Sequence, residues 1–143
     1  MTALLDVNIL LTLHNPRHTH YRLACNWFWG NESRNFATCP MTQTGLLRLL
    51  VQGLPGMAAY TYKEARQALL EVVKYPNHIY WPDSPSYLEA VDTIMARIQG
   101  YRQITDAYLL GLAIHNGGKL ATLDKGILHL SGPEFAQHVE LIA

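Results

Sequence analysis

Short apolar runs alternate with stretches of helical periodicity along the chain, and this alternation predicts an α/β fold. Five runs are predicted as strands: 3–6, 35–40, 78–82, 119–123 and 138–142. Apolar residues recur at helical spacing in the segments between them: 8–13, 21–30, 43–52, 61–74, 86–99 and 106–116. Strands that alternate with helices favour a parallel sheet covered on both faces. We therefore predict a three-layer α/β/α sandwich with a short parallel sheet, formed as one domain by residues 1–143.

Polar residues at the expected helix starts support these boundaries. Thr42 is a candidate N-cap for the helix 43–52, and Thr105 for the helix 106–116. Capping boxes at 61–64 and 86–89 predict helices that reach about Lys74 and Gln99. The helix from Asp106 is apolar nearly all round, which predicts a central, buried position.

Three acids fall where such a fold brings distant segments together. Asp6 ends the first strand, Asp124 follows the strand 119–123, and Asp106 opens a helix. Ligands of open parallel sheets gather beyond the carboxyl ends of the strands. We therefore expect all three acids at one rim of the sheet, with Gln43, at another helix start, as a further candidate.

Three carboxylates this close repel one another unless their pKa values rise or a cation neutralises them. A hard divalent ion with oxygen ligands, such as Mg²⁺, suits the set. An ion of this kind activates a bound water and stabilises charge on a phosphoryl oxygen, which favours phosphodiester hydrolysis. Asn8, Thr105 and Thr122 are candidates for holding these ligands or their waters in place.

Each residue also has a purely structural explanation. Asp6 can end a strand or cap a helix, and Asp106 can complement the helix dipole in a first turn. Asp124 can be a turn residue, and Gln43 can be exposed in a first helical turn. The hypothesis of a site depends on the three acids meeting at one edge.

Composition limits the classes of function. The 143 residues are 49% apolar, which is typical of a folded globular chain. Eleven basic and eleven acidic residues give a net charge of +0, which argues against a broad, charge-driven nucleic-acid binder. Cys25 and Cys39 form no spaced motif and suggest reduced thiols, with a disulfide as the alternative. The N-terminus is a poor signal peptide and no apolar run has bilayer length, so we expect a cytoplasmic protein without a membrane span.

Several other side chains have a functional and a structural interpretation. Arg48 and Arg102 are candidate contacts for RNA phosphate, or ordinary solvated residues. Tyr101 and Tyr108 are candidates for stacking on a base, or core residues. His14, His18 and His20 form a histidine cluster, but Pro16 between them makes a shared zinc site a poor interpretation. Trp27, Phe28 and Trp29 are adjacent on one predicted helix, so they cannot all face the core.

The candidate residues lie in four segments: LLDVNIL, CPMTQTGLLRLL, RQITDAYLLGLA and LATLDKGI. In order and spacing, from Ala3 to Ile127, these segments resemble the PIN-domain ribonucleases. More narrowly, they are similar to the VapC toxins of bacterial type II toxin–antitoxin pairs. The pairing of ITDAYLLGLA with LATLD is the most specific part of the resemblance.

The resemblance implies a PIN-like three-layer fold, Mg²⁺- or Mn²⁺-dependent endonucleolytic cleavage of RNA, a homodimer and a cognate antitoxin. Asp6, Asp106 and Asp124 match the first, third and fourth acids of the family. Asn8 and Thr122 match polar residues that accompany them. Gln43 stands where the family usually has its second acid, a Glu, so weaker metal binding is expected.

Two rival functions follow from the same residues. A PIN-like module that binds RNA or a protein partner without cleavage is consistent with Gln43. A phosphatase with an aspartate nucleophile needs a second acid two residues after the first. Asn8 stands at that position, which disfavours the phosphatase.

Overall fold

A parallel five-stranded sheet forms the centre of the molecule, whose computed structural model describes residues 1–31 and 34–142. The strand order is β3-β2-β1-β4-β5, so the first strand lies in the middle. The strands are short: β1 (Ala3–Leu5), β2 (Phe36–Thr38), β3 (His78–Tyr80), β4 (Lys119–Thr122) and β5 (Val139–Leu141). All five strand predictions are confirmed.

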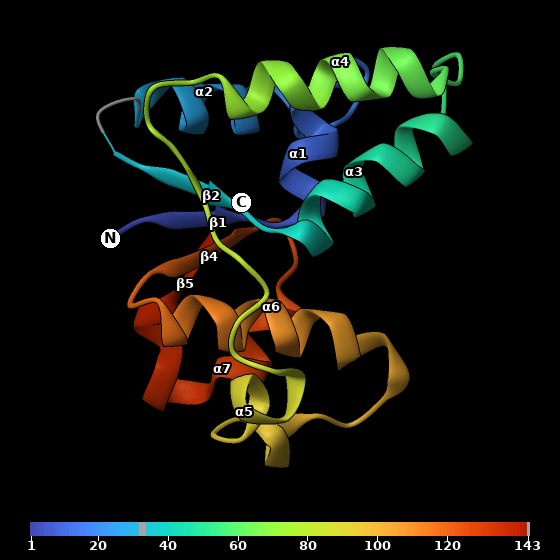
Figure 1. The fold of residues 1–143 in the computed structure, drawn as a ribbon. Helices are drawn as coiled ribbons and strands as arrows, with labels where there is room; N and C mark the ends of the chain where they lie inside the picture. The colour runs from blue at the N-terminus through green and yellow to red at the C-terminus, as the bar shows by residue number, and fades with distance from the viewer. Residues whose placement is uncertain (32–33, 143) are drawn as a thin grey trace.

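Helices cover both faces of this sheet. Figure 1 shows one layer on one side, formed by α1 (Val7–Leu13), α2 (Tyr21–Gly30), α3 (Pro40–Gln52) and α4 (Tyr62–Val73). The layer on the other side contains α5 (Tyr87–Val91), α6 (Ile104–His115) and α7 (Gly126–Phe135). Three short 3₁₀ segments complete the fold: Met95–Arg97, Tyr101–Gln103 and Ala136–His138. The predicted three-layer α/β/α architecture is confirmed.

Alternate residues of the central strands fill two separate cores. Leu4 of β1 and Leu120 of β4 belong to the core beneath α6, whereas Leu5 and Ala121 belong to the core beneath α1, α3 and α4. Successive side chains of a strand point to opposite faces, so a sheet buried on both sides is apolar at every position. This explains why the strand predictions rest on short continuous apolar runs.

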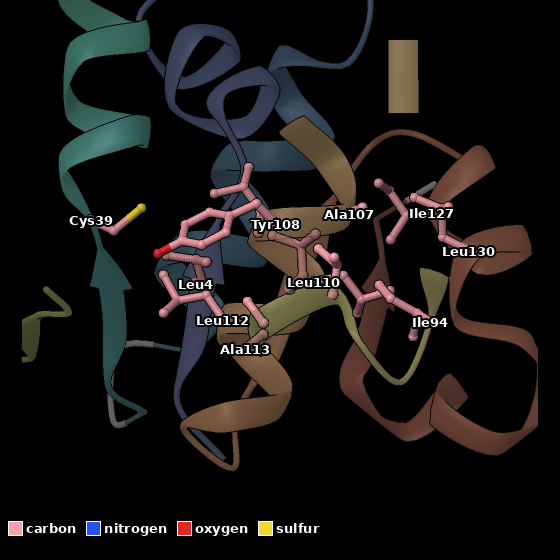
Figure 2. Packing of buried hydrophobic residues seen from close by; sticks show 14 of the residues in the cluster. Leu4, Cys39, Ile94, Ala107, Tyr108, Leu110, Leu112, Ala113, Ile127 and Leu130 are labelled. Atoms are coloured by element: carbon pink, nitrogen blue, oxygen red, sulfur yellow. The ribbon is translucent and has the colours of Figure 1, made fainter. Parts of the chain in front are cut away.

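Helix α6 is the most buried helix of its layer. Every residue from Ala107 to Ala113 is buried, as the apolar sequence predicted. Figure 2 shows Tyr108, Leu110 and Leu112 of α6 in one cluster with Leu4 of β1. The buried stretch begins at the end of the first turn, so Asp106 lies directly before the part of the helix that packs against the sheet.

Two predicted helix caps are wrong. Helix α3 starts at Pro40 with Cys39 as its N-cap, and Thr42 lies three residues further on. The Thr42 hydroxyl accepts a hydrogen bond from the Cys39 amide at 3.0 Å, so it closes the first turn from inside the helix. Thr105 is likewise the second residue of α6 rather than its cap. A 3₁₀ turn and a proline start these helices instead of a polar cap.

Two other boundaries differ from the sequence prediction. The helix predicted over 86–99 ends at Val91, and a 3₁₀ turn follows it. Helix α7 was not predicted, because Gly132, at φ 58°, and Pro133 interrupt its helical pattern. No helix in the described residues is long and apolar enough to cross a membrane.

Candidate active site

Three elements deliver the three acids to one rim of the sheet. Strands β1 and β4 are parallel neighbours, with Leu5 beside Ala121, so both end at the same edge. Asp6 follows β1 directly, and its backbone amide donates to the Ala121 carbonyl at 3.0 Å. Asp124 lies two residues beyond the end of β4. Asp106 lies in the first turn of α6, which packs against this part of the sheet.

Burial and neighbouring negative charge raise the pKa values of two of these carboxylates. The pKa of Asp106 rises from its ordinary 3.8 to about 6, first through burial and then through the negative charges of Asp6 and Asp124. The pKa of Asp6, which is only 6% exposed, is also raised, chiefly by burial, and Asp124 contributes here too. The rim therefore concentrates negative charge in a partly dry environment, which favours a bound cation.

This repulsion predicts a pH-dependent stability of the metal-free protein. Because the pKa of Asp106 is higher in the folded state, stability should fall as the pH rises from about 3.8 to about 6. Asp106→Asn mimics the protonated side chain and should weaken this fall. Urea unfolding in EDTA at pH 4, 5, 6 and 7.5 measures both proteins. Parallel pH profiles for the two would contradict the assigned repulsion.

The hydroxyl of Thr122 links the two strand-end acids. It donates to Asp6 Oδ2 at 2.7 Å and accepts from the Asp124 backbone amide at 3.0 Å. It also accepts from Asn8 Nδ2 at 3.2 Å, while Asn8 Oδ1 accepts from the Leu123 amide at 3.3 Å. Thr122 is fully buried, so this network fixes the orientation of the Asp6 carboxylate from the side away from solvent.

Asp124 has a structural role as well as its place at the rim. Its Oδ1 accepts from the Gly126 amide at 2.8 Å and so forms the turn into α7. The residue is exposed, and no residue in the described part of the chain donates to its second carboxylate oxygen. The turn interpretation is therefore confirmed for one oxygen of this side chain, and the site interpretation stays a prediction for the other.

Gln43 lies in the first turns of α3, next to the starting point of α1. Two residues along α3, Gly45 is so close to Val7 that a Cβ atom there would lie 2.8 Å from Val7 Cγ2. Val7 follows Asp6, so this contact places α3 beside the start of α1. The Gln43 amide nitrogen donates to Thr38 Oγ1 at 3.0 Å.

The remaining predicted residues are placed at the surface, with one exception. Thr105, Arg48 and Arg102 are exposed, and Tyr101 is 80% exposed. The Arg102 guanidinium lies over the Tyr101 ring and donates to its hydroxyl. Tyr108 is instead a core residue whose hydroxyl donates to the Pro85 carbonyl at 3.0 Å, so it cannot stack on a base.

The histidines near the N-terminus make local hydrogen bonds, and the neighbouring aromatics are partly exposed. His14 Nδ1 is bonded to the Leu10 carbonyl, and His18 accepts from the backbone of His20. Of the three adjacent aromatics, Trp29 is the most exposed, at 52%. Cys25 and Cys39 are both free thiols.

The acidic rim suits a hard cation that keeps most of its water. Among the described residues, no group of three or more Asp, Glu, His or Cys side chains is arranged so that it could hold a metal ion. Mg²⁺ typically takes only one or two carboxylates and completes its shell with water, so a site at this rim would use one or two of Asp6, Asp106 and Asp124 together with several waters. The set contains only oxygen donors, which favours Mg²⁺ or Mn²⁺ over softer metals.

The sequence analysis missed two residues behind this rim, Thr38 and His78. Thr38 Oγ1 lies 2.7 Å from His78 Nε2 and also accepts from Gln43. A threonine at the carboxyl end of a strand was a usable signal, because Thr122 occupies the equivalent place on β4. His78 gave no such signal, since its contact spans 40 residues of sequence.

Comparison with known proteins identifies the family. No family profile matches the chain. Ribonuclease VapC29 of Mycobacterium tuberculosis is 42% identical over 132 residues and covers 92% of each chain. Ribonuclease VapC38 of the same species is 36% identical over 140 residues, which is 98% of this chain and 97% of the relative.

A solved structure has the same fold. The VapBC2 structure from Rickettsia felis, bound to a DNA fragment from its promoter, matches over 100% of both chains with a TM-score of 0.67 and 14% identity. The fold is thus that of a PIN-domain protein. The chain belongs to the VapC ribonuclease family.

Proposed function

We propose that this protein is a Mg²⁺- or Mn²⁺-dependent endoribonuclease that acts in the cytoplasm as the toxin of a toxin–antitoxin pair. The observation that carries the proposal is that Asp6 and Asp124 follow neighbouring parallel strands and are joined through the Thr122 hydroxyl, with Asp106 in the first turn of α6. The raised pKa of Asp106, to which the other two carboxylates contribute, agrees with this arrangement. Relatives named ribonucleases over nearly the whole chain support RNA as the substrate.

Each residue of the rim has a role in this reaction. Asp6, Asp106 and Asp124 would hold the metal directly or through its waters, and Asp6 is kept in orientation by Thr122 and Asn8. When bound, the metal supplies a Lewis acid for the phosphoryl oxygen and lowers the pKa of a water that attacks phosphorus in line. Gln43 would accept a hydrogen bond from that water. Arg48 and Arg102 are exposed and available to RNA phosphates.

Cleavage of defined RNA tests the proposal directly. Purified protein incubated with a mixed panel of structured RNAs should produce discrete fragments in Mn²⁺ or Mg²⁺, and none in EDTA. Re-addition of Mn²⁺ after EDTA should restore the fragments. Fragments that persist unchanged in EDTA would show that the acids do not work through a metal.

A second function, RNA or protein binding without cleavage, is favoured by one observation. Gln43 brings no negative charge to the position where the family usually has Glu, so metal affinity should be lower. Under this alternative the protein retards RNA in a gel at millimolar Mn²⁺ and leaves it intact. Cleavage at rates above those of Asp6→Asn would exclude it.

We propose an antitoxin and a second copy of this chain as its protein partners. The relatives are VapC proteins, and the structural neighbour is a VapBC assembly. Co-expression with the product of a short reading frame next to this gene should give a co-purifying complex and relieve growth arrest. Light scattering of the toxin alone should give twice the 16.1 kDa of one chain. A monomer at micromolar concentration would contradict the dimer.

Gln43→Glu should tighten Mg²⁺ binding by roughly tenfold or more, because it adds a charge near a divalent ion. Isothermal calorimetry measures the change. Thr44→Glu is the matched control, since it adds the same charge at the neighbouring exposed position of α3. Unchanged or weaker affinity in Gln43→Glu, or equal gains in both variants, would count against Gln43 at the rim.

A further inference from the structure

A hydrogen-bonded chain of three side chains runs from β3 through β2 into α3. Gln43 Nε2 donates to Thr38 Oγ1 at 3.0 Å, and Thr38 Oγ1 lies 2.7 Å from His78 Nε2. Thr38 is fully buried at the carboxyl end of β2. It lies level with Leu5 of β1, one residue before Asp6, because the register pairs Leu4 with Ala37. This row of hydrogen-bonded side chains therefore ends near the acidic rim.

The direction of donation is assigned from the partners of the Thr38 hydroxyl. Its oxygen has one proton and two lone pairs, and it accepts from Gln43. Among the described residues its other partner is His78 Nε2, so we assign the proton to that contact, which makes Nε2 the acceptor and places the ring proton on Nδ1. Burial, which lowers the pKa of His78, agrees with a neutral ring.

We propose that Thr38 and His78 are positioning residues that hold the Gln43 amide with its oxygen directed to the metal-bound water. The proposal rests on the proposed metal-dependent cleavage. Carboxylates attract N–H groups, so an unrestrained glutamine beside three acids would turn its NH₂ toward them. Thr38 binds that NH₂ instead. The Gln43 oxygen, which accepts from no residue in the described part of the chain, is left available to the site.

The arrangement gives a glutamine part of the function of a glutamate. Both oxygens of a carboxylate accept hydrogen bonds, so either orientation works for a glutamate, whereas an amide has one correct orientation. Removal of the Thr38 hydroxyl should therefore lower the rate of RNA cleavage more in the natural protein, which has Gln43, than in the Gln43→Glu variant. This difference separates positioning from a general effect on folding.

Kinetic variants test the positioning role. Thr38→Val, which keeps the shape, should lower kcat for RNA cleavage by about tenfold with little change in KM, the size of effect that one hydrogen bond supplies. Thr38→Ser should restore the rate. Thr44→Val removes a hydroxyl from the exposed side of the same helical turn and should leave kcat unchanged.

A double-mutant cycle locates the effect. If Thr38 acts through Gln43, Thr38→Val should cause no further loss in Gln43→Ala and a smaller loss in Gln43→Glu. Full, additive losses in these backgrounds, or an unchanged kcat in folded Thr38→Val, would overturn the proposal.

The hydrogen-bond chain can be measured without activity. In ¹⁵N NMR of the metal-free protein, His78 Nε2 should have the shift of an unprotonated nitrogen and Nδ1 that of a protonated one. The Gln43 side-chain NH₂ should exchange slowly with water, and faster in His78→Phe or Thr38→Val. A protonated Nε2 would mean that His78 donates to Thr38 rather than accepting from it, and would refute the proposal. If His78 has the expected tautomer but the protein cuts no RNA, only the proposed nuclease function is refuted.

Discussion

Asp6→Asn is expected to lower RNA cleavage by a factor of about 10³ or more, since loss of the cation's electrostatic stabilisation costs several kcal/mol. Asp6 is the most buried of the three acids, and Thr122 fixes its orientation. Asparagine keeps the size of the side chain and an oxygen that can accept from Thr122. The substitution thus removes a charge from the rim while the hydrogen bond from Thr122 can be kept.

Single-turnover cleavage across a Mn²⁺ titration measures this effect. Asp92→Asn is the control, because Asp92 is an exposed carboxylate at the end of α5 and should keep full activity. Circular dichroism should show equal folding of both variants. A variant at Asp6 that cuts RNA at the normal rate with the normal metal dependence would remove Asp6 from the site.

Topology made the three acids predictable from the sequence. Strands β1 and β4 are recognisable as short apolar runs, and the residues after parallel strands must share an edge. Asp6 and Asp124 could therefore be assigned to one rim although 118 positions separate them in the numbering. Asn8 and Thr122 were candidates for holding the acids in place because of their positions beside them, and the family resemblance matched both residues. The structure adds the geometry, in which a single hydroxyl joins Asp6, Asn8 and the backbone of Asp124.

Tertiary packing decided what the sequence could not predict. Thr42 has the chemistry of an N-cap, but Pro40 after an extended Cys39 starts α3 earlier. The helical pattern over 86–99 ends at Val91, and the chain continues into the 3₁₀ segment Met95–Arg97 instead of a longer helix. The contact between Thr38 and His78 depends on the alignment of β2 with β3, and residue spacing carries no trace of it. Local sequence patterns were enough to predict helices and strands, whereas contacts between residues distant in sequence could be seen only in the folded structure.

Gly111→Ala should destabilise the protein by about 1–3 kcal/mol, the usual cost of an extra group in a packed core. Gly111 lies in the buried part of α6, where α5 crosses it. A Cβ atom at this position would overlap the Ala90 carbonyl oxygen and lie 2.6 Å from its carbon. Both atoms belong to the backbone, so no side chain can rotate away and α5 must move. The better helix propensity of alanine, worth about 1 kcal/mol, offsets only part of this cost.

Gly30→Ala is the matched control for urea unfolding of this variant. Gly30 ends α2, and a Cβ atom there would meet nothing within 4 Å, so stability should be unchanged or slightly higher. Equal stabilities of the two alanine variants would mean that α5 and α6 are not in close contact. Because Asp106 lies on α6 five positions before Gly111, a shift of this helix should also move a carboxylate of the rim. Gly111→Ala should therefore lower RNA cleavage even at temperatures where the variant is fully folded, which connects the tight packing of these helices to the geometry of the acids.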